Sequence, residues 1–171
     1  MSVNQEIRIR KFERPDLEEV KALIERTIDT CYDGYYCREV MDYFDMFHWP
    51  GNILKVAREG FVAVALIEGK IVATGSIIED KILRVFVNPS YQKRGLGKMI
   101  MDSLENQAAA NGLKSVQLRS LANAKKFYES LGYQTIEKGR VEVDNGSALE
   151  YYKMVKNLEA GKMPMNKGIG N

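Results

Sequence analysis

The sequence predicts an α/β fold with a mixed, mostly antiparallel central sheet of about seven strands and helices on both of its faces. One observation behind this is the element order that hydrophobic periodicity indicates, namely strand, two helices, three strands, helix, strand, helix and two strands. Three strands joined by tight turns form an antiparallel meander, whereas the later strand–helix–strand run is typical of parallel pairing. The second observation is length, because 171 residues suit one domain with a single core.

The N-terminal elements are a strand and two helices. Residues 5–12 alternate apolar and charged side chains, as a half-buried strand does. A helix follows, with Pro15 at its start and acidic residues in its first turn. Its apolar stripe consists of Leu17, Val20, Leu23, Ile24 and Ile28. Residues 36–47 predict a second helix, which the breaker segment HWPGN ends.

Residues 60–89 predict three consecutive strands. The stretch is rich in β-branched and apolar residues and is divided by the polar segments EGK and EDK, which suit tight turns. A helix over roughly 97–110 comes next and ends at Asn111–Gly112.

The C-terminal part predicts a strand, a short helix and a last antiparallel pair. Residues 114–120 form the strand, and residues 123–131 form the helix, with Asn123 as its N-cap and Gly132 after its end. Residues 133–143 and 147–155 pair around the turn at Asp144–Gly146. We therefore expect one domain over residues 1–157, and a mobile tail over 158–171 because that stretch has little to bury.

Composition excludes several functional classes. The net charge is only +2, so no strong positive field favours nucleic acid. No apolar run is long enough to span a membrane, and the charged N-terminus does not resemble a secretory signal. Cys31 and Cys37 have no metal-type spacing, so we expect no metal. We predict reduced thiols in a cytoplasmic protein, with a bridge between the two as the less favoured alternative.

A basic, glycine-containing turn between the strand at 82–87 and the following helix is the strongest functional signal. Gly95 and Gly97 allow close approach of a ligand to the backbone, and a helix N-terminus favours an anion. The turn is neither a Walker loop nor a dinucleotide-binding fingerprint, because the required residue spacings are missing. From the pattern alone, a phosphate site and a solvated basic turn are both open.

Two motifs resemble those of the Gcn5-related N-acetyltransferases, the GNAT superfamily. The first is V-x-P-x-Y-Q-x-x-G-x-G over residues 87–97. The second is N-A-x-x-F-Y-E-x-x-G-Y over residues 123–133. At the level of the fold the resemblance covers residues 5–157, and its specific part covers 82–133. It implies the GNAT fold and acetyl-CoA as cosubstrate, with no metal.

The resemblance also implies roles for individual residues. Backbone groups of Val85, Phe86 and Val87 would hold the pantetheine arm, and an N–H near Phe86 or Val87 would face the thioester oxygen. Tyr128 would contact the sulfur and protonate the departing thiolate, and Asn123 would bond the pantetheine. The pyrophosphate would be bound by the turn made of Gln92, Lys93, Arg94, Gly95, Leu96, Gly97 and Lys98.

A general base is harder to assign. Glu79 and Asp80 lie in a turn that more often faces solvent, and His48 is a lone histidine more typical of packing. Ordered water, or an acceptor of low pKa, would need no such side chain. Arg84 alternates with Ile82 and Phe86, so its side chain can face the acceptor, where it would suit a carboxylate of that molecule. Exposure to solvent or an internal ion pair is the commoner situation for such an arginine. The aromatic residues Tyr32, Tyr35, Tyr36, Tyr43, Phe44 and Phe47 fall in the region where, as the resemblance implies, a variable second helix forms the acceptor pocket. Helix packing explains most of them, and one or two could line the pocket.

The function predicted is acetyl transfer from acetyl-CoA directly to the amine of a small molecule or peptide, by a monomer or homodimer. The alternative is a coenzyme A-binding sensor or interaction module without turnover. A binder of nucleic acid or phosphoprotein is disfavoured because charge is near neutral and no aromatic residues interleave with 92–98.

Overall fold

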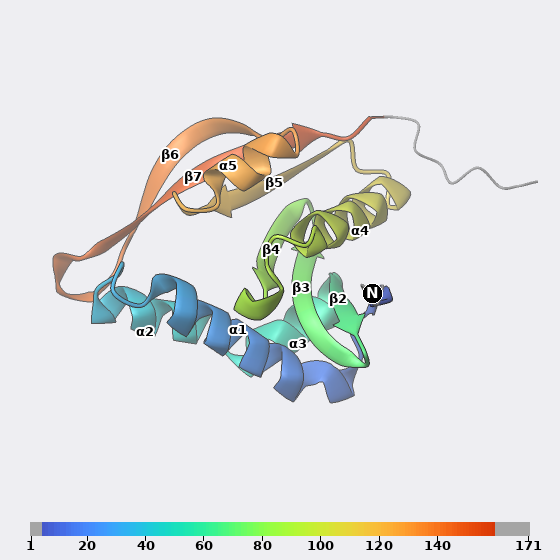
Figure 1. The fold of residues 1–171 in the computed structure, drawn as a ribbon. Coiled ribbons are helices and arrows are strands. Elements are labelled where there is room, and N and C mark those ends of the chain that lie inside the picture. Colours follow the sequence, from blue (N-terminus) through green and yellow to red (C-terminus); the bar gives the residue numbers. More distant parts are fainter. Residues whose placement is uncertain (1–4, 160–171) are drawn as a thin grey trace, which may run out of the picture.

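One seven-stranded sheet organises the protein, in the order β1-β2-β3-β4-β5-β7-β6 (Figure 1). The computed structural model describes residues 5–159. Every neighbouring pair is antiparallel except β4 and β5, which are parallel, so the predicted mixed sheet is confirmed. The strands are β1 (Ile7–Lys11), β2 (Phe61–Ile67), β3 (Lys70–Ile78), β4 (Lys81–Val87), β5 (Ser115–Ser120), β6 (Gln134–Glu142) and β7 (Ala148–Asn157).

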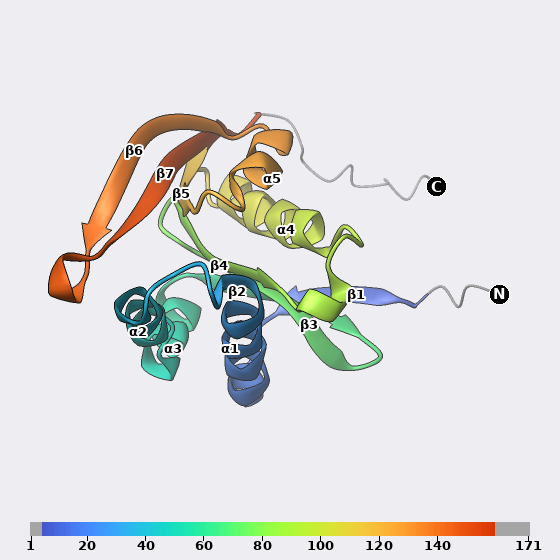
Figure 2. The ribbon, with the colours of Figure 1, turned by 60° about the vertical axis from the view of Figure 1, so that its left-hand side comes forward.

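Helices cover both faces of the sheet, as predicted (Figure 2). On one face lie α1 (Leu17–Tyr32), α2 (Arg38–Phe47) and α3 (Pro50–Glu59), and on the other lie α4 (Leu96–Ala110) and α5 (Lys125–Ser130). Alternating side chains of β2 separate the two cores, since Val62 and Val64 pack with the first group whereas Ala63 and Ala65 pack beneath α4. Short 3-10 turns are Arg14–Asp16, Pro89–Tyr91 and Asp144–Gly146.

Helix α3 was absent from the sequence prediction. Pro50 occupies its first turn, and Gly60 ends it. The apolar stripe is short, with Ile53 and Val56 buried against the sheet. The breaker segment at residues 48–52 hid this helix because the proline that ends α2 also begins α3.

The second correction concerns Asn123. Helix α5 begins at Lys125, its N-cap position is Ala124, and no side chain caps it. Asn123 is exposed in the preceding turn, so its predicted capping role is wrong. Leu158, the first residue of the predicted tail, contacts the rest of the fold, because its N–H donates to the Lys114 carbonyl at 2.8 Å and its side chain packs on the core. The prediction of mobility for 160–171 lies outside the described residues.

Strand β4 leaves its neighbour after two residue pairs. Lys81 pairs with Gln117 and Ile82 with Leu118, and no further β4–β5 pair forms. On its other side, β4 has an irregular register with β3 between Thr74 and Ser76, and Arg84 has a positive φ of 54°. Such a bulge bends a strand and re-aims its side chains. The two irregularities open the sheet at its centre.

Within the described part of the chain, no helix combines the length and apolarity needed to cross a membrane. Cys31 and Cys37 are both free thiols there.

Gly75 lets α4 lie close against the bent part of the sheet. A Cβ atom at this position would lie 2.5 Å from Ile100 Cγ2 and 3.0 Å from Leu104 Cδ1. We therefore expect Gly75→Ala to lower the free energy of unfolding by about 1–3 kcal/mol, measured by urea denaturation. Gly51→Ala is the control, because its methyl would meet only the exposed Trp49 side chain, and it should not destabilise. Equal stability of Gly75→Ala and the parent would contradict this packing.

Candidate active site

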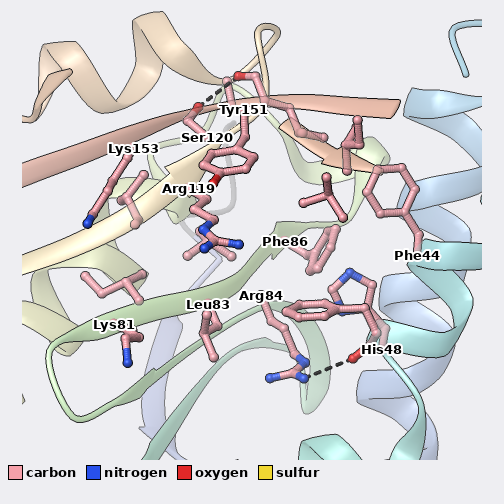
Figure 3. A pocket seen from close by; sticks show the side chains of 18 of the residues that line it. Phe44, His48, Lys81, Leu83, Arg84, Phe86, Arg119, Ser120, Tyr151 and Lys153 are labelled. Atoms are coloured by element: carbon pink, nitrogen blue, oxygen red, sulfur yellow. Dashed lines mark hydrogen bonds between the residues drawn. The ribbon is translucent and has the colours of Figure 1, made fainter. Parts of the chain in front are cut away.

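A cavity of about 500 Å³ lies where β4 and β5 diverge (Figure 3). Its walls come from β4, β5 and β7, from the C-terminal half of α2, and from Tyr128 of α5. One wall is largely aromatic, with Tyr32, Tyr43, Phe44, Phe47 and Phe86. Polar side chains from the strands also line the cavity. Apolar walls with a few polar groups are typical of a small-molecule site.

The end of β4 forms one side of this opening. Because no strand pairs with Val85, Phe86 and Val87 on the β5 side, that edge is available to a ligand. Val85 and Phe86 line the cavity directly. The Val87 carbonyl is not free, since it accepts a hydrogen bond from Gln92 Nε2 at 3.1 Å. Gln92 therefore holds the following turn against the end of β4.

The turn before α4 has the features of an anion site. Lys93 and Gly95 have positive φ values of 62° and 79°, and α4 begins at Leu96. Among the described residues, the backbone N–H groups of residues 93–98 donate to no protein acceptor. Unpaired N–H groups and the positive end of the helix dipole favour a bound anion.

The basic side chains of this turn differ in their surroundings. Arg94 stacks over the Tyr91 ring, 5.2 Å from its centroid. Lys98 forms an i,i+4 ion pair with Asp102 at 2.7 Å, which raises the pKa of Lys98. Lys93 and Arg94 form no ion pair within the described residues. The turn thus retains positive charge around its open N–H groups.

The two sequence motifs meet in space. A Cβ atom on Gly97 would lie 3.0 Å from Phe127 Cζ, so the first turn of α4 fits directly against α5. Phe127 also packs beside Tyr128, with ring centroids 5.1 Å apart. A side chain at position 97 would require the Phe127 ring to shift, so the glycine favours this close approach of the two motifs.

Tyr128 is the buried phenol of the site. Its side chain is 9% exposed and packs edge-on to Tyr133, and it lines the cavity. Burial raises the pKa of Tyr128 above its ordinary value, with a smaller contribution from Tyr32. The hydroxyl therefore keeps its proton at neutral pH. It has no hydrogen-bond partner among the described residues.

Arg84 and His48 form a buried pair of polar groups beside the cavity. Arg84 Nη2 donates to the Phe47 carbonyl at 3.0 Å, and the guanidinium lies 5.0 Å from the centroid of the Phe47 ring. Arg84 Nε and Nη1 and His48 Nδ1 are buried without a partner in the described structure. Burial lowers the pKa of Arg84 to about 10, so it stays charged. Burial, together with the charge of Arg84, lowers the pKa of His48 to about 3.

The predicted alternation of β4 side chains holds only in part. Phe86 lies on the face that contacts α1, α2 and α3, and Arg84 reaches α2 on that face, but Ile82 packs in the core beneath α4. The bulge explains the difference, because it interrupts the two-residue period between Ile82 and Arg84.

The candidate carboxylates Glu79 and Asp80 do not line the cavity, although each bonds a residue that does. Glu79 is exposed and pairs with Lys81 at 3.1 Å, and Asp80 Oδ2 accepts from Gln117 Nε2 at 2.6 Å. Tyr35, also a candidate, is 84% exposed, and neither it nor Tyr36 lines the cavity. Asn123 is exposed and also absent from the lining. Within residues 5–159 no group of three or more His, Cys, Asp and Glu side chains is placed to hold a metal.

Sequence reasoning missed the contribution of β5 and β7. Gln117, Arg119, Tyr151 and Lys153 line the cavity. Arg119 and Lys153 are direct cross-strand partners, and Arg119 stacks on Tyr151 with 4.5 Å to the ring centroid. Alternation in QLRS and YYK could have indicated one polar face on each strand, but their pairing is not visible in the sequence.

Comparison with known proteins agrees with this geometry. The family description "Acetyltransferase (GNAT) domain" matches residues 38–158. The uncharacterized N-acetyltransferase YafP of Escherichia coli (strain K12) is 25% identical over 153 residues, covering 88% of this chain and 96% of YafP. Protein BSU40680 of Bacillus subtilis (strain 168) is 42% identical over 55 residues, a match that spans 32% of this chain and only 37% of that protein.

Solved structures share the fold. A GCN5-related N-acetyltransferase from Rhodopseudomonas palustris has a TM-score of 0.80 at 22% identity, covering 92% of this chain and 99% of its own. The PaiA N-acetyltransferase from Thermoplasma acidophilum, in complex with coenzyme A, has a TM-score of 0.71 at 19% identity. The match covers 89% of this chain and 99% of the PaiA chain.

The pKa of His48 predicts how stability depends on pH. His48 is the only histidine, and its pKa is about 3 in the folded state against about 6.5 when unfolded. Below pH 6.5 the unfolded chain therefore binds a proton that the folded chain does not, so stability falls as pH falls. Between pH 8 and 5.5 we expect a loss of about 1.4 kcal/mol. Urea denaturation should show a flatter profile for His48→Gln, and equal slopes in both proteins would contradict the buried neutral imidazole.

Proposed function

Because the chain belongs to the GNAT acetyltransferase family, we propose that it transfers an acetyl group from acetyl-CoA to an amine. The observation that most supports this is the junction of an open anion-binding turn with a cavity containing a buried phenol. The amine would attack the thioester directly, without a covalent enzyme intermediate. We place the reaction in the cytoplasm, where Cys31 and Cys37 stay reduced.

The residues present fit coenzyme A. The free N–H groups of 93–98, with the charges of Lys93 and Arg94, would bind its pyrophosphate. Gln92, Gly95, Leu96, Gly97 and Lys98 would shape that turn, with Gln92 joining it to β4. The unpaired edge of Val85–Val87 would bond the pantetheine arm. Asn123 stays a candidate for the same arm, because its side chain is exposed and not used in capping.

The chain's own groups would assist both halves of the transfer. Acetyl-CoA supplies an activated acyl group and a thiol leaving group. A backbone N–H near Phe86 or Val87 would stabilise the negative charge on the thioester oxygen during attack. Tyr128 would donate its proton to the departing sulfur. Although burial raises the pKa of the phenol, the same desolvation would raise the pKa of a thiol beside it, so proton transfer from Tyr128 to the thiolate stays feasible.

The amine must lose its proton before it attacks. No Asp or Glu lines the cavity, and His48, with a pKa of about 3, is too weak a base for an ammonium ion. The cavity instead contains the cations Lys81, Arg84, Arg119 and Lys153. Nearby positive charge lowers the pKa of an ammonium ion, so the site favours the neutral amine, and water would accept the proton.

The lack of a suitable base also favours a second candidate, a coenzyme A-binding module without turnover. Release of free thiol from acetyl-CoA, measured across a panel of amines, separates the two. Turnover with any amine supports the transferase. Saturable binding of coenzyme A with no amine accepted supports the module, and no binding at all contradicts both.

Tyr128→Phe tests the proposed proton donor. The hydroxyl bonds no described residue, so its removal should leave the fold and coenzyme A affinity unchanged. With saturating amine, kcat should fall about 10-fold to 100-fold because the thiolate then departs without a proton. Single-turnover measurements of thiol release provide the value. Unchanged kcat would remove Tyr128 from the mechanism.

The basic turn should control coenzyme affinity. We expect Lys93→Gln and Arg94→Gln each to weaken coenzyme A binding about 3-fold to 10-fold, since each removes one charge near a phosphate. Isothermal titration at two salt concentrations should show that the difference shrinks at high salt. Arg140→Gln, an exposed position on β6 that pairs with Glu142, is the matched control. A similar loss in Arg140→Gln would mean that net charge, not the turn, is responsible.

A further inference from the structure

We propose that the acceptor is a small amine that also carries an anionic group, and that Arg84, Arg119 and Lys153 bind this group. The inference rests on the proposed acetyl transfer and specifies its second substrate. It follows from the charges of the cavity, from the unpaired donors of Arg84 and from the arrangement of β5 and β7.

The cavity is strongly unbalanced in charge. Its lining includes Lys81, Arg84, Arg119 and Lys153, and no aspartate or glutamate (Figure 3). Only Lys81 has a carboxylate partner, the exposed Glu79 outside the cavity. Net charge of the whole chain is only +2, so this concentration of cations is local. A cavity of this kind attracts anions and repels polycations.

Arg84 is the deepest of these cations. It is 8% exposed, it lines the cavity, and its Nε and Nη1 have no acceptor. Its contacts are the Phe47 carbonyl and the face of the Phe47 ring, neither of which neutralises its charge. A buried charge without an ionic partner is costly, and so is each buried donor without an acceptor. A bound anion in the cavity would provide the missing ionic partner.

Arg119 and Lys153 provide a second and independent observation. They are directly opposed on β5 and β7, an arrangement of like charges that destabilises a strand pair, and Lys153 faces Glu137 of β6 only on its other side. Neither forms an ion pair with a described residue, and stacking on Tyr151 holds Arg119 at the cavity. An anion between them would turn this repulsion into attraction.

The anion of this site is not the coenzyme pyrophosphate. None of residues 92–98 lines the cavity, and the cations described above come from β4, β5 and β7. The space of about 500 Å³ must also admit the acyl end of the donor, so the acceptor is small. Aromatic walls suit an apolar body between its amine and its anionic group. A carboxylate and a phosphate share this chemistry.

Matched pairs of amines test the inference on the whole protein. Leucine against leucinamide reports a carboxylate, and O-phosphoethanolamine against ethanolamine reports a phosphate. Binding of each to the protein saturated with coenzyme A is measured by calorimetry, and turnover by thiol release from acetyl-CoA. We expect the anionic member of at least one pair to be favoured about 10-fold to 100-fold, as for charge-assisted hydrogen bonds. A carboxylate raises the pKa of the neighbouring amine, so amine reactivity alone would favour leucinamide.

Three variants connect the preference to the named cations. Arg84→Met should abolish the preference while coenzyme A affinity stays unchanged. If Arg84→Met does not fold, the double variant Arg119→Gln with Lys153→Gln takes its place, because both residues lie outside the buried core. It should reduce the preference for the anionic amine at least threefold, which is about half of a tenfold preference on a logarithmic scale. Arg140→Gln removes an exposed charge outside the cavity and should retain the full preference.

The outcomes separate this inference from the proposed function. Equal binding of both members of each pair, or a preference for spermidine, would overturn the inference even if acetyl transfer occurs. A loss of coenzyme A affinity in Arg84→Met would also overturn it, because the cations would then belong to the coenzyme site. Preferential binding of the anionic amine without any thiol release would support the anion site and overturn the transferase.

Discussion

The structure depends on the early separation of two parallel strands. β4 and β5 pair only at Lys81–Gln117 and Ile82–Leu118, and beyond them the sheet opens. Backbone hydrogen-bonding groups that would close a continuous sheet are left unpaired along β4. The gap is lined by residues of α1, α2 and α5 as well as by the strands. The same separation lets the chain turn after β4 so that α4 begins with its N–H groups unpaired. The separation of β4 from β5 and the bulge between β4 and β3 therefore produce both the unpaired strand edge and the cavity, and the turn before α4 follows directly after them.

This opening has an energetic cost that the rest of the fold offsets. Arg84 adopts a positive φ in the bulge, a strain of about 1–3 kcal/mol for a non-glycine residue, and its charge is buried. His48 is held neutral beside it. Against this stand two cores, one between α4, α5 and the sheet and the other beneath α1, α2 and α3. Strain and unpaired polar groups concentrate at functional sites, and here they lie around a single cavity.

Patterns within short stretches of the sequence predicted the helices, strands and turns that those stretches form. Strand and helix periodicity predicted every strand and all helices except α3, and the glycines of the 92–98 turn indicated its conformation correctly at Gly95. The capping role predicted for Asn123 is wrong because the turn continues one residue past it. The bulge at Arg84 had no signal, since its cause is a register between β3 and β4. Arg119 and Lys153 were invisible for the same reason, because only the pairing of β5 with β7 brings them together.

In the proposed reaction, residues close together in the sequence would bind the acyl donor, and residues distant in the sequence would bind the acceptor. Coenzyme A would be held mainly by backbone groups in one continuous stretch, and such groups are specified by turns and glycines rather than by side-chain identity. The acceptor would be chosen by side chains of three strands and one helix that meet only in the folded state. Substitutions at Arg119, Lys153 or Tyr151 on β5 and β7 can therefore change the acceptor while the turn before α4 stays intact, since none of these positions contacts that turn's N–H groups. For this reason a short sequence motif is enough to predict the acyl donor, whereas predicting the class of acceptor requires the charges of the folded cavity.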